Sequence, residues 1–341
     1  MSRVNKNKIL VTGSAGFMGS HLVDYLIDRG YLVYGIDNLS GGYLENISPK
    51  ARQTFFKIDL MNRKKTAQFI KKYRPQIIYH LAASAHEGLS QFTPIHHTEN
   101  NLIAYLNLLV PAINYGLKRI VLTSSMAVYG EQKAPFDETM PRLPADIYGV
   151  AKSAMEEATE ILADVYQLQY VILRPHNVYG PRQNLADPYR NVVAIFINRL
   201  LQNKPFYIYG DGNQKRAFSY IDDITPPIAK AGFIKANHGI INIGPERSYT
   251  INYLAQIILK SFASPLKAIY LPARPREVRE AYCSSAKARK LLGFKDQVNL
   301  QEGVKRMIDW ARVVGYQKTK YLNSIEIKSE KLPLTWKKKL I

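Results

Sequence analysis

A glycine-rich turn between an apolar strand and a helix is the feature that most limits how this chain can fold. Residues 8–12 form a short run that is mainly apolar and β-branched, as in a strand buried in a parallel sheet. They lead directly into Gly13-Ser14-Ala15-Gly16-Phe17-Met18-Gly19, and helical spacing begins at His21. Glycines at these positions allow a tight turn, close approach of the backbone to a pyrophosphate, and close packing of helix on strand. We therefore predict a dinucleotide at the N-terminus of the first helix.

A second predicted strand, residues 31–36, ends at an acidic residue, Asp37. A carboxylate at this point suits the two ribose hydroxyls of NAD and would repel the 2′-phosphate of NADP, so it favours NAD as the cofactor. The alternative is a cap for a turn, because Asp37 and Asn38 precede the sequence Leu-Ser-Gly-Gly at 39–42.

The rest of the first half alternates between strand and helix patterns. Further strands are predicted at 54–59, 77–82, 119–123 and 170–173, with helical patterns between them, for example over 101–115. This alternation predicts an α/β fold, a Rossmann-type doubly wound parallel sheet with ligands beyond the carboxyl ends of its strands. The residues expected along that edge are Gly13, Asp37, Asp59, Ala82, Ser124 and Ser125.

Tyr148 and Lys152 are spaced to share one face of a helix, one turn apart. An ammonium held there favours the phenolate, so a tyrosine with an ordinary pKa of about 10 can act as a base near neutrality. A Tyr four residues before a Lys also arises by chance, as a surface ring beside a solvated charge. Together with a dinucleotide motif, the pair predicts catalysis.

These residues stand in a set of motifs that resembles a known family, the extended short-chain dehydrogenase/reductases. The resemblance is to their NAD-dependent nucleotide-sugar epimerases and dehydratases, and within these to the UDP-hexose 4-epimerases. It runs from residue 8 to about residue 316. The motifs are TGSAGFMGSH at 12–21, IDNLSGG at 36–42, DL at 59–60, HLAA at 80–83, TSSMAVYG at 123–130, YGVAK at 148–152, LRPHNVYGPRQN at 173–184 and RAFSYIDD at 216–223.

The resemblance implies a cofactor site in the first half of the chain. The residues that would bind NAD are Gly13, Gly16, Phe17, Met18, Gly19, Asp37, Asn38, Asp59, Leu60, Leu81, Ala82, Ala83, Asn101, Thr123, Tyr148 and Lys152. Asp59 and Leu60 would meet the adenine. For Asn101 an equal alternative is a helix cap or a buried structural amide.

The resemblance also implies the catalytic residues. Ser125 aligns with the family's catalytic Ser or Thr, which hydrogen-bonds the reacting sugar oxygen; Ser124 is the alternative if the alignment slips by one. Tyr148 would remove the hydroxyl proton while hydride leaves the same carbon for the nicotinamide. Lys152 would support the phenolate and bind the nicotinamide ribose. Rotation of the resulting 4-keto sugar before hydride returns gives epimerisation without net redox.

The two residues after Ser125 distinguish between reactions. Dehydrating members of the family carry Asp-Glu there, and decarboxylating members generally keep the Glu. Met126 and Ala127 occupy these places here, and neither can transfer a proton. A UDP-sugar 4-epimerase is therefore predicted, with a UDP-glucuronate 4-epimerase or a 4-ketoreductase as alternatives. A non-catalytic dinucleotide sensor is the rival of another class, disfavoured because Ser125, Tyr148 and Lys152 all remain.

The second half is expected to bind the nucleotide. By the resemblance, the substrate residues besides Ser125 are Asn177, Asn191, Val192, Arg216, Arg274 and Glu277. The two arginines would clamp the diphosphate through paired hydrogen bonds, and an ordinary surface charge is the alternative for each. Arg276 and Glu277 stand where the family has Gly-Asp, which puts the turn of this loop in doubt.

Three further residues bear on the sugar. Ala281 aligns with a position where a small side chain leaves room for an N-acetyl group at C2, although a slip of one residue would place Tyr282 there. His86 and Glu87 depart from the family's usual string beside the sugar. They are either sugar contacts or an exposed loop pair.

Length and composition complete the prediction. The 341 residues, 46% of them hydrophobic, exceed the usual span of one domain. We expect an NAD-binding domain at 1–176 with return segments near 222–244, a nucleotide-sugar domain at 177–316 and a basic tail at 317–341. The resemblance implies a homodimer.

Cysteine and charge bear on location and partners. The single Cys283, the absence of a signal-peptide pattern or of a membrane-length apolar run, and the absence of Cys/His metal spacing predict a cytoplasmic protein without a metal. The net charge is +20. The basic tail is expected to be solvated surface, with contact to an anionic membrane or nucleic acid as the less favoured alternative.

Overall fold

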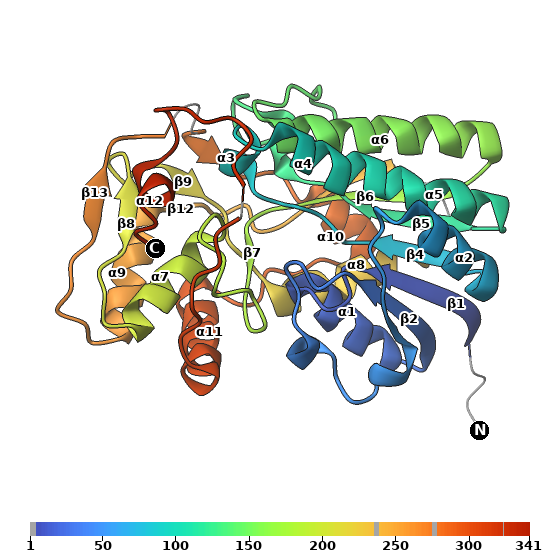
Figure 1. Ribbon diagram of the computed structural model, residues 1–341, viewed down its shortest axis with the longest axis horizontal. Coiled ribbons are helices and arrows are strands. Elements are labelled where there is room, and N and C mark those ends of the chain that lie inside the picture. Colours follow the sequence, from blue (N-terminus) through green and yellow to red (C-terminus); the bar gives the residue numbers. More distant parts are fainter. Residues whose placement is uncertain (1–4, 235–238, 275–277, 323) are drawn as a thin grey trace.

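Seven parallel strands form the central sheet (Figure 1). The computed structural model describes residues 5–234, 239–274, 278–322 and 324–341. In this part of the chain the strand order across the sheet is β11-β6-β5-β4-β1-β2-β3. Strands β1 to β3 are added toward one edge and strands from β4 onward toward the other, so the topological switch point of a Rossmann-type fold lies between β1 and β4. The predicted fold class is confirmed. The strands are β1 (Asn5–Thr12), β2 (Tyr31–Asp37), β3 (Phe55–Lys57), β4 (Ile77–His80), β5 (Arg119–Thr123), β6 (Gln169–Pro175) and β11 (Gly239–Ile243).

Helices cover both faces of the sheet because successive strand side chains point to opposite sides. Ile9 and Val11 are buried in the cluster that contains the apolar face of α1, whereas Leu10 between them is buried in the cluster on the other face. The helices are α1 (Phe17–Ile27) and α8 (Ile221–Ala231) on the first face, and α2 (Arg63–Tyr73), α5 (Ala104–Asn114) and α6 (Ile147–Tyr166) on the second.

The segment after β4 is irregular for a specific reason. Leu81 and Ala82 were predicted as strand, but their N–H groups both donate to Thr12 Oγ1 at 3.2 Å, and β4 ends at His80. Two short helices follow, α3 (Glu87–Ser90) and α4 (Pro94–Thr98). The helix predicted over 101–115 begins as a π-helical turn, Glu99–Ile103, and continues as α5.

A second lobe follows β6 and holds small sheets and three packed helices (Figure 1). Its elements are β7 (Val178–Tyr179), α7 (Val192–Leu201), β8 (Tyr207–Tyr209), β9 (Lys215–Arg216), β10 (Ser219–Tyr220), β12 (Tyr249–Thr250), α9 (Ile251–Ser261), β13 (Ile269–Leu271), β14 (Glu280–Ala281) and α11 (Leu300–Val314). The chain returns to the large sheet in α8, β11 and α10 (Ala286–Leu292), because α8 packs on α1 and α10 packs on both α8 and β11. The domain boundaries remain predictions.

The C-terminal segment, described at residues 318–322 and 324–341, folds back onto the molecule, and its lysines lie exposed on the surface. It ends with the short helix α12 (Leu334–Lys337), in which Thr335 and Trp336 are buried. None of the helices in the described residues is long and apolar enough to cross a membrane.

Candidate active site

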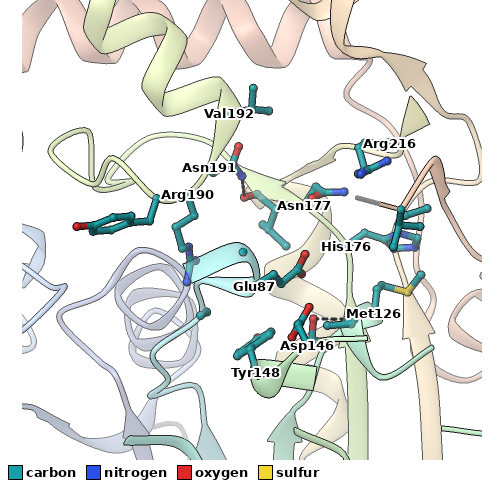
Figure 2. Close-up of a pocket in the computed structure, with 18 of the residues that line it drawn as sticks. Glu87, Met126, Asp146, Tyr148, His176, Asn177, Arg190, Asn191, Val192 and Arg216 are labelled. Atoms are coloured by element: carbon teal, nitrogen blue, oxygen red, sulfur yellow. Dashed lines mark hydrogen bonds between the residues drawn. The ribbon is translucent and has the colours of Figure 1, made fainter. Parts of the chain in front are cut away.

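A cavity of about 420 Å³ lies between the carboxyl edge of the large sheet and the second lobe (Figure 2). It brings together residues predicted separately for cofactor, chemistry and nucleotide. They are Phe17, Met18, Leu81, Ala83, Thr123, Ser125, Tyr148, Lys152, Asn177, Asn191, Val192, Arg216 and Arg274. Outside its wall, among the described residues, are Gly13, Gly16, Gly19, Asp37, Asn38, Asp59, Leu60, Ala82 and Asn101.

The glycine turn leaves no room for side chains. Gly13 has φ of +68°, and a Cβ built there would lie 2.8 Å from the backbone nitrogen of Ala82. A Cβ on Gly19 would overlap the carbonyl oxygen of Gly13. The glycines carry no side chains that would keep a ligand away from the backbone, and helix α1 begins at Phe17. The turn therefore fits the pyrophosphate of a dinucleotide.

Asp37 caps the neighbouring turn. Its carboxylate accepts hydrogen bonds from the N–H groups of Ala15 at 3.0 Å and Leu39 at 2.7 Å. Burial raises the pKa of Asp37, while the N–H groups of Leu39 and Ala15 favour the ionised form. Asn38 likewise accepts from Ser40 N at 2.9 Å. The alternative of a turn cap is therefore real, and the contact of Asp37 and Asn38 with NAD remains a prediction.

Three other predicted cofactor residues make structural hydrogen bonds. Asp59 accepts from Met61 N at 2.8 Å, and Leu60 O accepts from the side chain of Asn107 at 3.0 Å. Asn101 is fully buried, and its amide donates to Ser84 O at 3.0 Å and His97 O at 2.7 Å. Asn101 thus acts as the structural amide that was its alternative; binding of NAD by Asp59, Leu60 or Asn101 stays a prediction.

Ser125, Tyr148 and Lys152 converge at the end of β5. Asp146 caps α6 by accepting from Gly149 N at 2.7 Å, which sets Tyr148 in the first helical turn. Ser125 lies near the hydroxyl of Tyr148 and lowers its pKa by a hydrogen-bonding interaction with the phenolate. Lys152 Nζ lies 5.8 Å from the centroid of the Tyr148 ring and donates to Thr123 O at 2.8 Å.

The charges around Tyr148 act in opposite directions. Burial raises the pKa of Tyr148, Arg190 and the hydrogen bond from Ser125 lower it, and Glu87 raises it. Burial also lowers the pKa of Lys152 to about 7, against the opposing effect of Glu156. Arg190 is thus a second cation beside Tyr148, and the support of the phenolate by Lys152 stays a prediction.

Arg190 was missed by the sequence analysis. It is half-buried in the cavity wall, and Figure 2 shows it extending from the loop before α7 toward the helix that carries Glu87. No sequence motif marks Arg190, which stands directly before Asn191. Tyr148 and Glu87, the residues it lies near in the structure, are distant from it in the sequence.

Of the two residues flagged beside the sugar, one lines the cavity. Glu87 lies in its wall, and His86 instead pairs with Asp187, with Nε2 and Oδ2 2.9 Å apart. Asp146 also lines the cavity; burial and then the charge of Glu87 raise its pKa to about 7. Contact of Glu87 with the sugar stays a prediction, and His86 is held by its pair with Asp187.

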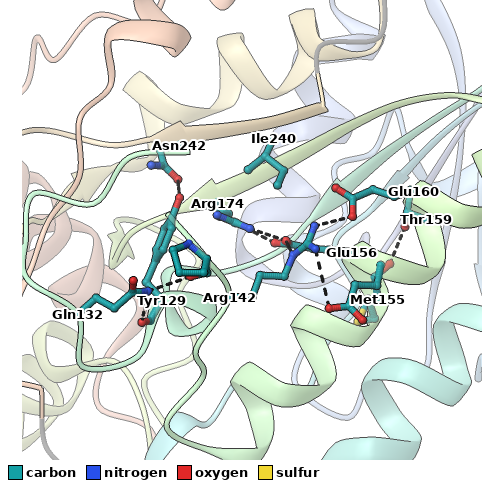
Figure 3. A network of polar contacts seen from close by, with 12 residues as sticks. Tyr129, Gln132, Arg142, Met155, Glu156, Thr159, Glu160, Arg174, Ile240 and Asn242 are labelled. Carbon is teal, nitrogen blue, oxygen red and sulfur yellow. Dashed lines mark hydrogen bonds and ion pairs between the residues drawn. The ribbon is translucent and has the colours of Figure 1, made fainter. Parts of the chain in front are cut away.

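A buried ion-pair network fixes the helix that carries Tyr148 and Lys152 (Figure 3). Glu156, one turn after Lys152, is fully buried and accepts from Arg174 Nε at 2.9 Å and Nη2 at 2.5 Å. Arg142 Nε donates to the same carboxylate at 2.7 Å. Because Arg174 belongs to β6, the network ties α6 to the sheet.

The nucleotide end is built from loops. The Asn177 amide donates to Ala217 O and that of Asn191 to Val178 O, each at 3.0 Å. The Arg274 guanidinium lies 5.0 Å from the centroid of the Tyr209 ring. Arg216 and Arg274 both face the cavity, while Arg276 and Glu277 lie outside the described residues.

Comparison with known proteins decides the family. The model of the NAD dependent epimerase/dehydratase family matches residues 9–244. The chain belongs to this family. UDP-glucose 4-epimerase of Mycolicibacterium smegmatis is 33% identical over 89% of this chain and 98% of its own length. UDP-glucuronate 4-epimerase of Thermodesulfobacterium geofontis is 30% identical over 89% of this chain and 95% of its own. The crystal structure of UDP-glucose 4-epimerase from Thermotoga maritima with UDP-glucose has a TM-score of 0.86 and 35% identity, over 90% of this chain and 99% of that one.

Membership of the NAD dependent epimerase/dehydratase family confirms the resemblance and the cofactor class, NAD. The residues fit that cofactor. The glycine turn packs its backbone closely against the segment after β4 at the start of α1, and Thr123 Oγ1 is buried without a hydrogen-bond partner at the cavity wall. In the described residues there is no group of His, Cys, Asp or Glu that could hold a metal ion.

Proposed function

We propose that this protein catalyses the NAD-dependent 4-epimerisation of a UDP-sugar. The observation that carries the proposal is the continuity of one cavity from Ser125, Tyr148 and Lys152 to Arg216 and Arg274. A sugar joined to a nucleotide diphosphate spans such a cavity, with its reacting carbon at one end and its phosphates at the other. The names of the relatives support the same reaction.

Each reactive residue has one task in this proposal. Ser125 donates a hydrogen bond to the sugar O4 and holds it beside Tyr148 Oη. Tyr148, as the phenolate, takes the proton from O4 and gives it back when the reaction reverses. Lys152, held by Thr123 O, supplies positive charge on the same helix face. NAD held in the glycine turn would supply the acceptor and then the donor for the hydride of the sugar's C4.

Met126 and Ala127 limit the reactions open to the oxidised sugar. Both residues line the cavity, but a thioether and a methyl group carry no ionisable proton, so neither side chain can exchange protons with the sugar. Simple return of hydride is the outcome that these residues support.

A second candidate is the UDP-glucuronate 4-epimerase, favoured by Arg190. Its guanidinium is half-buried in the cavity beside Tyr148, and a sugar carboxylate would form charge-assisted hydrogen bonds with it. The relative from Thermodesulfobacterium geofontis bears that name.

Ala281 lies in the cavity wall, and its small side chain supports room for an N-acetyl group at C2 of the sugar. The homodimer and a cytoplasmic location remain expectations from the family resemblance.

The test is product analysis with UDP-glucose, UDP-N-acetylglucosamine and UDP-glucuronate, each incubated with the purified protein without added cofactor. Separation of the C4 epimers should reveal conversion of at least one sugar. The preferred one distinguishes the two candidates. No conversion of any of them, with NAD then supplied, would contradict both.

A further inference from the structure

The C-terminal segment, residues 318–341, closes one wall of the cavity. Pro333, Trp336 and Ile341 all line it. This segment lies outside the residues that the family model matches, 9–244. Whatever it contributes to binding is therefore not described by the family's motifs.

Two sets of contacts hold the segment across both sides of the cavity. Toward the large sheet's side, the Glu326 carboxylate accepts from the N–H groups of Ile95 and His96 in α4, both at 2.8 Å. Toward the second lobe, Thr335 Oγ1 and the Tyr209 hydroxyl lie 2.6 Å apart. These hydrogen bonds hold the segment in place at the cavity.

Trp336 is the side chain through which the segment reaches the cavity. It is 6% exposed, and its indole N–H donates to Pro188 O at 3.2 Å. A Cβ built on Gly88 would lie 3.3 Å from Trp336 Cη2 and 3.9 Å from Nη1 of Arg274. The edge of the indole and a guanidinium nitrogen of Arg274, the arginine assigned to the diphosphate, therefore both lie close to Gly88 in α3, the helix that carries Glu87.

That place is where the proposed function puts the sugar ring. The sugar must lie between the diphosphate at Arg274 and the reactive hydroxyl of Tyr148. A large aromatic side chain offers an apolar surface for the C–H groups of a hexose. Gly88 leaves the space that the indole edge occupies, because any side chain there would press on it.

We infer that Trp336 contacts the hexosyl group of the substrate and is a specificity-determining residue. The inference rests on the proposed function, from which it takes the position of the sugar. The alternative is that Trp336 only packs in the apolar cluster with Leu89 and Phe92.

The test compares equilibrium binding of UDP-glucose with that of UDP, by calorimetry, in wild type and in Trp336→Ala. We expect the substitution to weaken UDP-glucose about tenfold, equivalent to about 1.4 kcal/mol, and to change UDP affinity by less than about twofold. Trp336→Phe should restore most of the lost affinity, because it keeps an aromatic face. Leu334→Ala is the matched control, since Leu334 is 39% exposed on the same short helix.

Equal losses for both ligands, or no loss for either, would overturn the inference. If Trp336→Ala does not fold, Gly88→Ala decides, because its methyl group would press on the indole edge at 3.3 Å and should weaken UDP-glucose more than UDP. Binding does not require turnover, so the two proposals fail separately. A wild type that binds UDP-glucose more tightly than UDP but converts no sugar would contradict only the epimerase. A wild type that binds both alike would contradict the role of Trp336.

Discussion

The reactive end and the nucleotide end of the cavity are built in different ways. Tyr148 and Lys152 stand on a twenty-residue helix whose position is fixed by the buried pair of Glu156 and Arg174. Arg216 lies on a two-residue strand, and Arg274 lies in a loop. Chemistry at a single carbon needs fixed atoms, whereas a diphosphate can be held by long, charged side chains. The residues that transfer protons therefore stand on the element that the buried ion pair holds in place, and the residues assigned to the phosphates do not.

The largest contrast should come from one substitution at each end. Tyr148→Phe removes the base and should lower kcat by about 10²- to 10⁴-fold with little effect on UDP affinity. Arg274→Ala should instead raise KM and weaken UDP by about tenfold or more, because it removes charge-assisted hydrogen bonds. Steady-state kinetics and UDP titration measure both. A kcat loss in Arg274→Ala as large as that in Tyr148→Phe would break the division between the two ends.

The next contrast concerns stability at the reactive end. Glu156→Gln leaves the buried Arg174 without its counter-charge and should lower the free energy of unfolding by about 3–5 kcal/mol. Glu157→Gln is the control, since Glu157 is exposed and 3.8 Å from Arg142, and should change it by less than about 1 kcal/mol. Denaturant unfolding measures the two. Similar stability of both variants would mean that the network does not anchor α6.

The smallest contrast lies within the charges around Tyr148. Arg190 lowers the pKa of Tyr148 and Glu87 raises it. The limb of the pH–kcat profile that rises as Tyr148 loses its proton should therefore move to higher pH in Arg190→Gln and to lower pH in Glu87→Gln. Loss of Glu87 also lets Asp146 ionise more readily, which limits the second shift. Movement of both variants in one direction would contradict these assignments.

Sequence patterns predicted the elements whose contacts are local. The bounds of β5, the glycine turn and the Tyr148–Lys152 helix follow from spacing alone, since backbone geometry fixes which neighbours meet. The end of β4 at His80 did not follow, because it depends on Thr12 in another strand. Arg190 and Trp336 were invisible for the same reason: each reaches the cavity through contacts between residues far apart in the chain.

The nucleotide end shows a further limit of motif reading. Asn177 and Asn191 lie at the cavity as expected, yet their amides bind backbone carbonyls. A motif places such residues without distinguishing an amide that shapes a loop from one that meets the ligand. The basic tail was interpreted from its charge, which did not predict that Trp336 within it is buried.

The central claim, that hydride leaves and returns to one carbon while the sugar rotates, has a direct test. UDP-glucose carrying deuterium at C4 is converted by the purified protein, and the product is analysed by mass spectrometry and NMR. The account predicts the C4 epimer with deuterium retained at C4. Deuterium lost to solvent, or found at another carbon, would contradict it.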